Sequence, residues 1–204
     1  MKKLMIATNN KGKAKDFETL FSPYGFEVQT LNDLDQDIDV EETGVTFEEN
    51  AVLKAEEVSK LLGIIVIADD SGLEIDKLKG APGVYSARYA GEQKNDEANI
   101  DKVLSELQGV PQQERTARFR CVLAVAGPGV ETVTFSGSCE GLILEERRGT
   151  NGFGYDPIFY VPEKGRAMAE LSPEEKGEIS HRGAALRQLK EQLPRLLDSL
   201  GEQQ

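Results

Sequence analysis

The sequence is poor in the residues that form disulfides and structural metal sites. Its 204 residues include 2 cysteines, Cys121 and Cys139, and 1 histidine, His181. A structural zinc site takes four ligands, mostly cysteine and histidine, so this set is too small to supply one. Both cysteines fall in runs typical of strands, which predicts buried thiols in a cytoplasmic protein.

Long apolar runs are also missing. No stretch approaches the roughly 20 apolar residues that a membrane-spanning helix requires. The apolar run at residues 3–7 is too short for a signal peptide, and polar Thr8 follows it directly. We therefore expect a cytoplasmic protein without a membrane partner.

Basic charge is scarce as well. The chain has 24 lysines and arginines against 36 acidic residues, a formal net charge of −12. A broad nucleic-acid surface requires a basic patch, so no nucleic-acid partner is expected. A small phosphorylated ligand remains compatible, because it requires only a few lysines and a metal ion.

The length of 204 residues suits one domain, 1–204. Apolar periodicity predicts that this domain begins with alternating strands and helices. Thr46 and Glu49 form a capping box before the second helix, and Gly63 should end that helix. This order is typical of an α/β protein. The strands are expected at residues 3–7, 26–31 and 64–68, and the helices at 12–21 and 47–62.

The second part of the chain has a different pattern. A helix is expected at residues 99–107, followed by strands at 116–126, 132–138 and 141–145. Glycine-containing connections favour antiparallel hairpins between these strands. Pro194 should kink or interrupt the final helix, which begins at about His181. The patterns together predict a central mixed β-sheet flanked by helices, in two lobes with an active-site cleft between them.

The first segment with possible chemistry joins the first strand to the first helix. Free N–H groups at a helix N-terminus and nearby lysines can hold phosphate. Taken alone, the segment is more typical of an ordinary helix cap with solvated lysines. It consists of Thr8, Asn9, Asn10, Lys11, Gly12 and Lys13.

Acidic pairs form the second feature. Asp69 and Asp70 directly follow the apolar strand, and Glu41 and Glu42 lie in a loop before the capped helix. Adjacent carboxylates repel each other, and a bound cation would relieve that cost. The Asp-Asp-Ser-Gly sequence also suits a polar turn. Lys54, within the helix, has the sequence context of an ordinary surface lysine.

The third feature lies near the end of the chain. The loop at residues 149–157 places two aromatic residues among three glycines, which suits stacking against a flat ligand but is also found in ordinary turns. Lys176 and the segment 180–183 follow. His181 alone is more typical of a structural residue than of a catalytic base.

These segments together resemble the inosine/xanthosine triphosphate pyrophosphatase family, in the family's order from Thr8 to Gly183. Asn9 and Asn151 depart from the family pattern, which often has glycine there. The matching segments are Thr8-x-Asn10-x-x-Lys13, Glu41 to Ala55, Ala68 to Leu73, Gly80 to Tyr89, Gly152 to Pro157 and Ser180 to Gly183.

The resemblance implies a homodimer that uses Mg²⁺ and cleaves purine nucleoside triphosphates such as dITP, ITP and XTP between the α- and β-phosphates. It implies that Glu41 and Asp70 bind the metal, and that Asp70 also activates water. Glu42 and Asp69 remain alternative ligands. Phosphates would be held by Thr8 to Lys13 and Lys54; the rest of the nucleotide would be held by Ser71, Phe153, Gly154, Tyr155, Asp156, Lys176, His181 and Arg182.

Two other functions remain open from the sequence. A non-catalytic nucleotide sensor would keep the lysines and aromatics but would not need Glu41, Asp69 and Asp70. A pyrophosphatase of related fold could act on other nucleotides, including modified pyrimidines. Only the resemblance at Ser180-His181-Arg182 favours purines.

Overall fold

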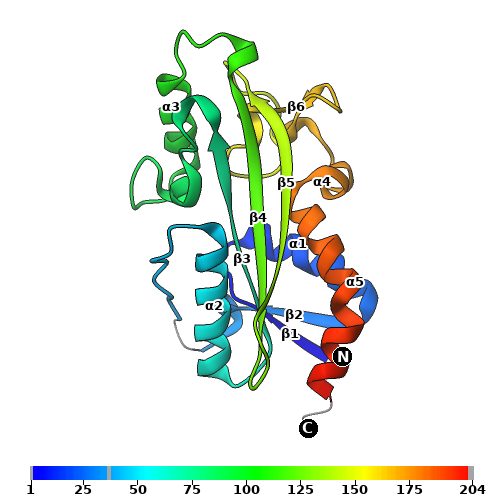
Figure 1. The fold of residues 1–204 in the computed structure, drawn as a ribbon. Helices are drawn as coiled ribbons and strands as arrows, with labels where there is room; N and C mark the ends of the chain where they lie inside the picture. The colour runs from blue at the N-terminus through cyan, green and yellow to red at the C-terminus, as the bar shows by residue number, and fades with distance from the viewer. Residues whose placement is uncertain (1, 36–37, 202–204) are drawn as a thin grey trace. The chain divides into compact units, whose positions relative to one another are not determined.

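The computed structural model describes residues 2–35 and 38–201. A seven-stranded sheet has the order β2-β1-β3-β4-β5-β6-β7 (Figure 1). The strands are β1 (Lys2–Ile6), β2 (Phe26–Thr30), β3 (Val66–Ile75), β4 (Thr116–Ala126), β5 (Val133–Ile143), β6 (Phe159–Val161) and β7 (Arg166–Ala167). The helices are α1 (Lys11–Phe21), α2 (Phe47–Leu62), α3 (Asp96–Glu106), α4 (Pro173–Ile179) and α5 (His181–Gly201).

Parallel and antiparallel pairs both occur, which confirms the predicted mixed sheet. β1 runs parallel to β2 and to β3, whereas β6 runs antiparallel to β5 and to β7. The chain forms two compact units. Unit 1 comprises residues 1–70, 122–136 and 185–204, and unit 2 comprises residues 71–121 and 137–184.

Unit 1 contains the α/β half that the sequence predicts. Thr46 caps α2 through the Glu49 amide, and the Glu49 side chain returns to the Thr46 amide, as the capping box requires. Gly63 ends α2 in the left-handed conformation. Thr132 donates a hydrogen bond to Glu56 of α2, and Thr134 donates one to Glu48 of the same helix. Figure 1 shows α2 alongside the strands.

Three of the predicted strands were wrong in their bounds. The strand expected at 64–68 runs from Val66 to Ile75, because buried Leu73 and Ile75 continue it beyond the acidic pair. The two strands expected at 132–138 and 141–145 are instead parts of one strand, β5, which runs from Val133 to Ile143. Gly137, expected in a connection, therefore lies within a strand. Pro194 was expected to kink or interrupt the final helix. It does not interrupt it, since α5 continues to Gly201.

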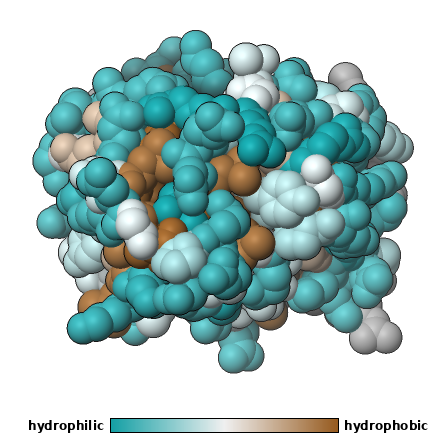
Figure 2. Space-filling model, turned by 90° about the horizontal axis from the view of Figure 1, so that it is seen from above, coloured by the Kyte–Doolittle hydropathy of each residue, from teal (hydrophilic) through white to brown (hydrophobic). Residues whose placement is uncertain are grey.

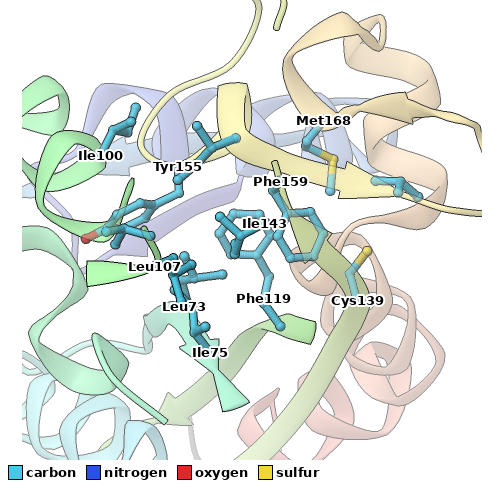
Figure 3. Packing of buried hydrophobic residues seen from close by; sticks show 14 of the residues in the cluster. Leu73, Ile75, Ile100, Leu107, Phe119, Cys139, Ile143, Tyr155, Phe159 and Met168 are labelled. Carbon is cyan, nitrogen blue, oxygen red and sulfur yellow. The ribbon is translucent and has the colours of Figure 1, made fainter. Parts of the chain in front are cut away.

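Unit 2 is built around a buried apolar cluster, shown in Figure 3. Residues of β3, α3, β4, β5 and β6 contribute to it, and the Phe119 and Phe159 rings lie 4.3 Å apart between centroids. Burial of this cluster supplies the main stabilisation of the unit. Its largest members include Leu73, Ile75, Ile100, Leu107, Phe119, Ile143, Tyr155 and Phe159.

Both cysteines are buried in strands, as the sequence predicts, with Cys121 in β4 and Cys139 in β5. Hydrophilic side chains dominate the face shown in Figure 2, with apolar side chains set among them. Within residues 2–35 and 38–201, no helix combines the length and apolarity that crossing a membrane would require.

Candidate functional site

The acidic pair of β3 lies in a cluster of opposite charges in unit 1, which we call the acid–lysine cluster. Its members are Lys13, Glu42, Lys54, Asp69 and Asp70. Lys13 Nζ lies 3.0 Å from Asp69 Oδ2. Lys54 Nζ donates to Glu42 Oε1 and to the Asp69 carbonyl, each at 2.7 Å, and lies 3.9 Å from Asp70 Oδ1. Three carboxylates thus share two ammonium groups.

The parallel strands explain why these residues meet. β1 pairs with β3 at Met5–Val66 and Ile6–Ile67, so the segment after β1 lies beside the acidic part of β3. The backbone confirms this proximity, since Ala7 N donates to Ile67 O at 2.8 Å. α1 then begins at Lys11 and carries Lys13 to Asp69.

Asn10 caps α1. Its Oδ1 accepts from the amides of Gly12 at 2.9 Å and Lys13 at 3.1 Å, and its own amide donates to Thr8 Oγ1 at 3.1 Å. Thr8 is buried, whereas Asn9, Asn10 and Lys11 are exposed. The exposed helix start and Lys13 together give this segment the positive character that a phosphate requires.

The loop at residues 41–46 is held against α2 by a residue that sequence reasoning did not single out. Asn50 is buried, and its Oδ1 accepts from the Gly44 amide at 2.7 Å. This bond places the loop where Glu42 reaches Lys54 one turn further along the helix. An asparagine inside an amphipathic helix was the available signal, because an amide side chain there needs a polar partner. Glu41 is exposed in the same loop.

Burial and the neighbouring lysines act in opposite directions on the pKa of Asp70. Burial raises the pKa of this carboxyl from its usual 3.8 to about 6, although Lys54 and Lys13 act to lower it. Burial also acts to lower the pKa of Lys54, but attraction to Asp70, Asp69 and Glu42 raises it overall. At neutral pH the cluster therefore keeps a carboxylate that can accept a proton beside a fully charged ammonium group.

The raised pKa of Asp70 predicts that Asp70→Asn stabilises the protein at neutral pH. The folded carboxyl holds its proton more tightly than the unfolded one, so its stabilising contribution is present below pH 3.8 and lost as pH rises through about 6. Two pKa units correspond to roughly 3 kcal/mol. Urea unfolding in a chelator should show the variant gaining on wild type between pH 4 and pH 6. A gap that is constant with pH would contradict this.

A second group of predicted residues meets in unit 2, which we call the aromatic cluster: Ser71, Phe153, Asp156, Lys176 and Arg182. Lys176 Nζ lies 2.6 Å from Asp156 Oδ2 and 4.6 Å from the centre of the half-buried Phe153 ring. Arg182 Cζ lies 5.8 Å from the same ring centre, and Arg182 Nη2 donates to Ser71 Oγ at 3.1 Å. The cluster therefore presents an aromatic ring with donors and an acceptor around it.

Close backbone approach explains the glycines of this cluster. A side chain at Gly152, where φ is +77°, would place its Cβ 2.0 Å from Asp156 Oδ2. At Gly183 the added Cβ would lie 2.0 Å from the Gly177 carbonyl oxygen of α4. The first glycine admits the Asp156 carboxylate beneath the loop, and the second lets α5 begin against α4 with Arg182 in place.

Asp156 is almost fully buried, with an acceptor role fixed by its neighbours. Burial raises the pKa of this carboxyl, while Lys176, the Phe153 amide and Arg182 oppose the rise. The Phe153 amide donates to Asp156 Oδ2 at 3.1 Å. The Asp156 carboxylate therefore accepts hydrogen bonds from both the Phe153 backbone amide and the Lys176 ammonium group.

The remaining predicted residues of unit 2 have other surroundings. The His181 ring stacks on Phe119 with a centroid distance of 4.8 Å, which places it against the buried core. The Gly154 amide donates to Asp96 Oδ2 at 3.0 Å. Tyr155 is buried, and its hydroxyl donates to the Ser86 carbonyl at 2.6 Å.

The donor chemistry of the acid–lysine cluster fits magnesium. Carboxylate oxygens are the protein ligands that Mg²⁺ prefers, and one or two usually suffice alongside phosphate and water oxygens. Among the described residues, no group of three acidic, histidine or cysteine side chains is arranged to hold a metal on its own. A metal held partly by the phosphates of a ligand is compatible with both observations.

The comparisons of this chain with known proteins all point to one family. The model of the Ham1 family matches residues 4–192. The dITP/XTP pyrophosphatase of Bacillus licheniformis is 59% identical over 93% of this chain and 96% of its own length. The Ham1 protein structures of Staphylococcus aureus and Coxiella burnetii superpose with TM-scores of 0.85 and 0.86, at 52% and 43% identity. They cover 95% and 96% of this chain, and 98% and 100% of their own.

Proposed function

This chain belongs to the Ham1 family, and we propose that it is a magnesium-dependent nucleoside triphosphate pyrophosphatase. Its substrates would be aberrant purine nucleotides such as dITP, ITP and XTP, and its products the monophosphate and pyrophosphate. The observation that carries the proposal is Asp70, a buried carboxylate with a raised pKa in a cluster with Lys13 and Lys54. Relatives named dITP/XTP pyrophosphatases support the same reaction and argue against a non-catalytic sensor.

The acid–lysine cluster would hold the triphosphate. Several negative charges must enter a protein of net charge −12, so local positive charge is needed. The ammonium groups of Lys13 and Lys54 and the start of α1 supply it. The phosphates would compete with Asp69, Asp70 and Glu42 for the ammonium groups of these lysines.

Magnesium would be held by Asp70 and Glu41, with Glu42 and Asp69 as alternative ligands, and it would neutralise phosphate charge and acidify the attacking water. Asp70 would accept the proton of a water that attacks the α-phosphorus. The new bond would join the water oxygen to the α-phosphorus. The bond from the α-phosphorus to the oxygen that bridges it to the β-phosphorus would break, and pyrophosphate would leave with that oxygen. Positioning and charge neutralisation account for most of the catalysis in such transfers.

The aromatic cluster would hold the base. Phe153 offers a face for stacking against the base. Lys176 and Arg182 are hydrogen-bond donors beside this ring, and Asp156 is an acceptor beside it. Asp70 and Ser71 are consecutive residues of β3, and Ser71 Oγ accepts from Arg182. The strand therefore carries the proposed catalytic carboxylate next to a residue of the base site. His181 would support this site from the core side.

The base site predicts that Arg182→Ala erodes the preference for ITP over ATP more than the preference over GTP. Hypoxanthine and guanine carry a carbonyl acceptor at C6, whereas adenine carries an amino donor, and arginine can only donate. An opposed donor pair costs ~1–3 kcal/mol, or roughly 10–100-fold in kcat/KM. Competition assays with the three nucleotides measure both ratios. A variant that keeps the full ratio against ATP would show that Arg182 does not read C6.

We also propose, from the family resemblance, that the protein is a homodimer, and, from its buried thiols, that it is cytoplasmic. Light scattering at micromolar concentration should then give twice the 22.4-kDa mass of the chain. A mass of one chain would contradict the dimer.

A further inference from the structure

Tyr155 lies in the loop of the proposed base site but is a member of the buried core of unit 2. Its side chain is 6% exposed, and Figure 3 shows the ring among the core side chains. The hydroxyl donates to the backbone carbonyl of Ser86 at 2.6 Å. Of the two residues next to Tyr155, Asp156 belongs to the aromatic cluster and Gly154 is half-exposed.

Ser86 continues the connection to β3. Its Oγ accepts from the Leu73 amide at 2.9 Å and donates to the Gly83 carbonyl at 2.6 Å, and the residue is 7% exposed. Leu73 follows Ser71 by two positions and Asp70 by three on the same strand. One buried serine thus joins the strand that carries Ser71 to the loop that carries Phe153 and Asp156.

We propose that Tyr155 and Ser86 are positioning residues whose linkage, Leu73–Ser86–Tyr155, sets the base selectivity of the enzyme without touching the nucleotide. The inference rests on the proposed function for its substrate. Base discrimination depends on donors and acceptors held to a fraction of an ångström, and such precision comes from the residues that support them. The linkage fixes Phe153 and Asp156 relative to Ser71, the partner of Arg182.

The loop requires this anchor. Gly152 and Gly154 both have positive φ, and glycines leave a loop many alternative conformations. The neighbouring bond from the Gly154 amide to Asp96 is exposed to water and holds the loop less firmly than a buried bond does. Burial, together with nearby Tyr89 and Asp96, raises the pKa of Tyr155, so the hydroxyl stays a donor across the neutral range.

Tyr155→Phe removes the hydroxyl and keeps the ring. We expect the kcat/KM ratio of ITP to GTP to fall about 5-fold, as for loss of one buried hydrogen bond. KM for ITP should rise while kcat is unchanged. Tyr160→Phe, at a half-buried tyrosine of β6, is the matched control and should keep the wild-type ratio. A Tyr155→Phe protein that is less stable but keeps the wild-type ratio would show a purely structural role and overturn the proposal.

Ser86→Ala tests the other end of the linkage by removing the bond to the Leu73 amide. Because either change breaks the same connection, the double variant should lose no more selectivity than the worse single variant. Losses that multiply would mean that the two residues act independently, which contradicts a single linkage.

Hydrogen exchange separates the linkage from the proposed function, because it needs no nucleotide. Loop amides at Phe153 and Gly154 should exchange faster in Tyr155→Phe and in Ser86→Ala than in wild type or Tyr160→Phe. If wild type releases no pyrophosphate from ITP but these amides are deprotected, the function fails and the linkage stands. Unchanged exchange in both variants would overturn the linkage, whatever the activity.

Discussion

Asp70→Asn should nearly abolish turnover while nucleotide binding remains measurable. The side chain is almost isosteric, but the amide cannot accept the proton of the attacking water. Loss of a general base typically costs ~10²–10⁴-fold in rate. The phosphates would still meet Lys13 and Lys54, whose charges the substitution leaves in place. Pyrophosphate release under saturating ITP measures the rate, and calorimetric titration measures the binding.

Asp76→Asn provides the matched control for this substitution. Asp76 is a surface carboxylate of unit 2, paired with Arg118 at 2.9 Å, and it has no place in either cluster. Its amide variant should keep wild-type turnover. Wild-type turnover in Asp70→Asn as well would remove Asp70 from the mechanism, and loss of binding would assign it mainly to holding substrate.

Arg115→Met should destabilise the protein by about 3 kcal/mol or more. Arg115 is 2% exposed, and its guanidinium donates to the carbonyls of Leu107, Ile143 and Leu144 at 2.8 to 2.9 Å. These carbonyls lie at or just after the ends of α3 and β5, so this side chain, directly before β4, joins both elements to the start of β4. Methionine fills much of the volume but donates nothing, and a buried polar group left unsatisfied costs ~1–3 kcal/mol.

Arg118→Met is the comparison that isolates burial. Arg118 bonds Asp76 and Glu140, but its side chain is 26% exposed, and water can replace those partners. Its loss should cost less than about 1 kcal/mol. Urea unfolding of both variants gives the two free energies. Equal losses would mean that the buried carbonyls of unit 2 do not depend on Arg115.

Local signals predicted the helices of this chain well. Thr46, Glu49 and Gly63 predicted both ends of α2, because capping is a short-range interaction. Strand ends were less predictable. Asp69 and Asp70 look like a turn in sequence, yet they lie within β3, because nearby Lys13 and Lys54 compensate for burying their carboxylates.

The candidate site was predictable as a set of residues but not as a set of contacts. The motifs named Lys13, Lys54 and Asp70, which the fold brings together. They did not show that Glu42 contacts Lys54, or that Tyr155 is buried with its hydroxyl on Ser86. Such contacts depend on how a loop packs against a helix or against the core, and no local pattern specifies them. The metal assignment to Glu41 therefore remains a prediction.

Hydrolysis of ITP in ¹⁸O-labelled water tests the central claim most directly. The reaction is run with and without Mg²⁺, and the label in both products is read by mass spectrometry. Attack at the α-phosphorus places the label in inosine monophosphate, with unlabelled pyrophosphate as the only other early product and no reaction in chelator. Label in pyrophosphate, or early release of orthophosphate, would contradict the assignment of this chain's chemistry to the α-phosphorus.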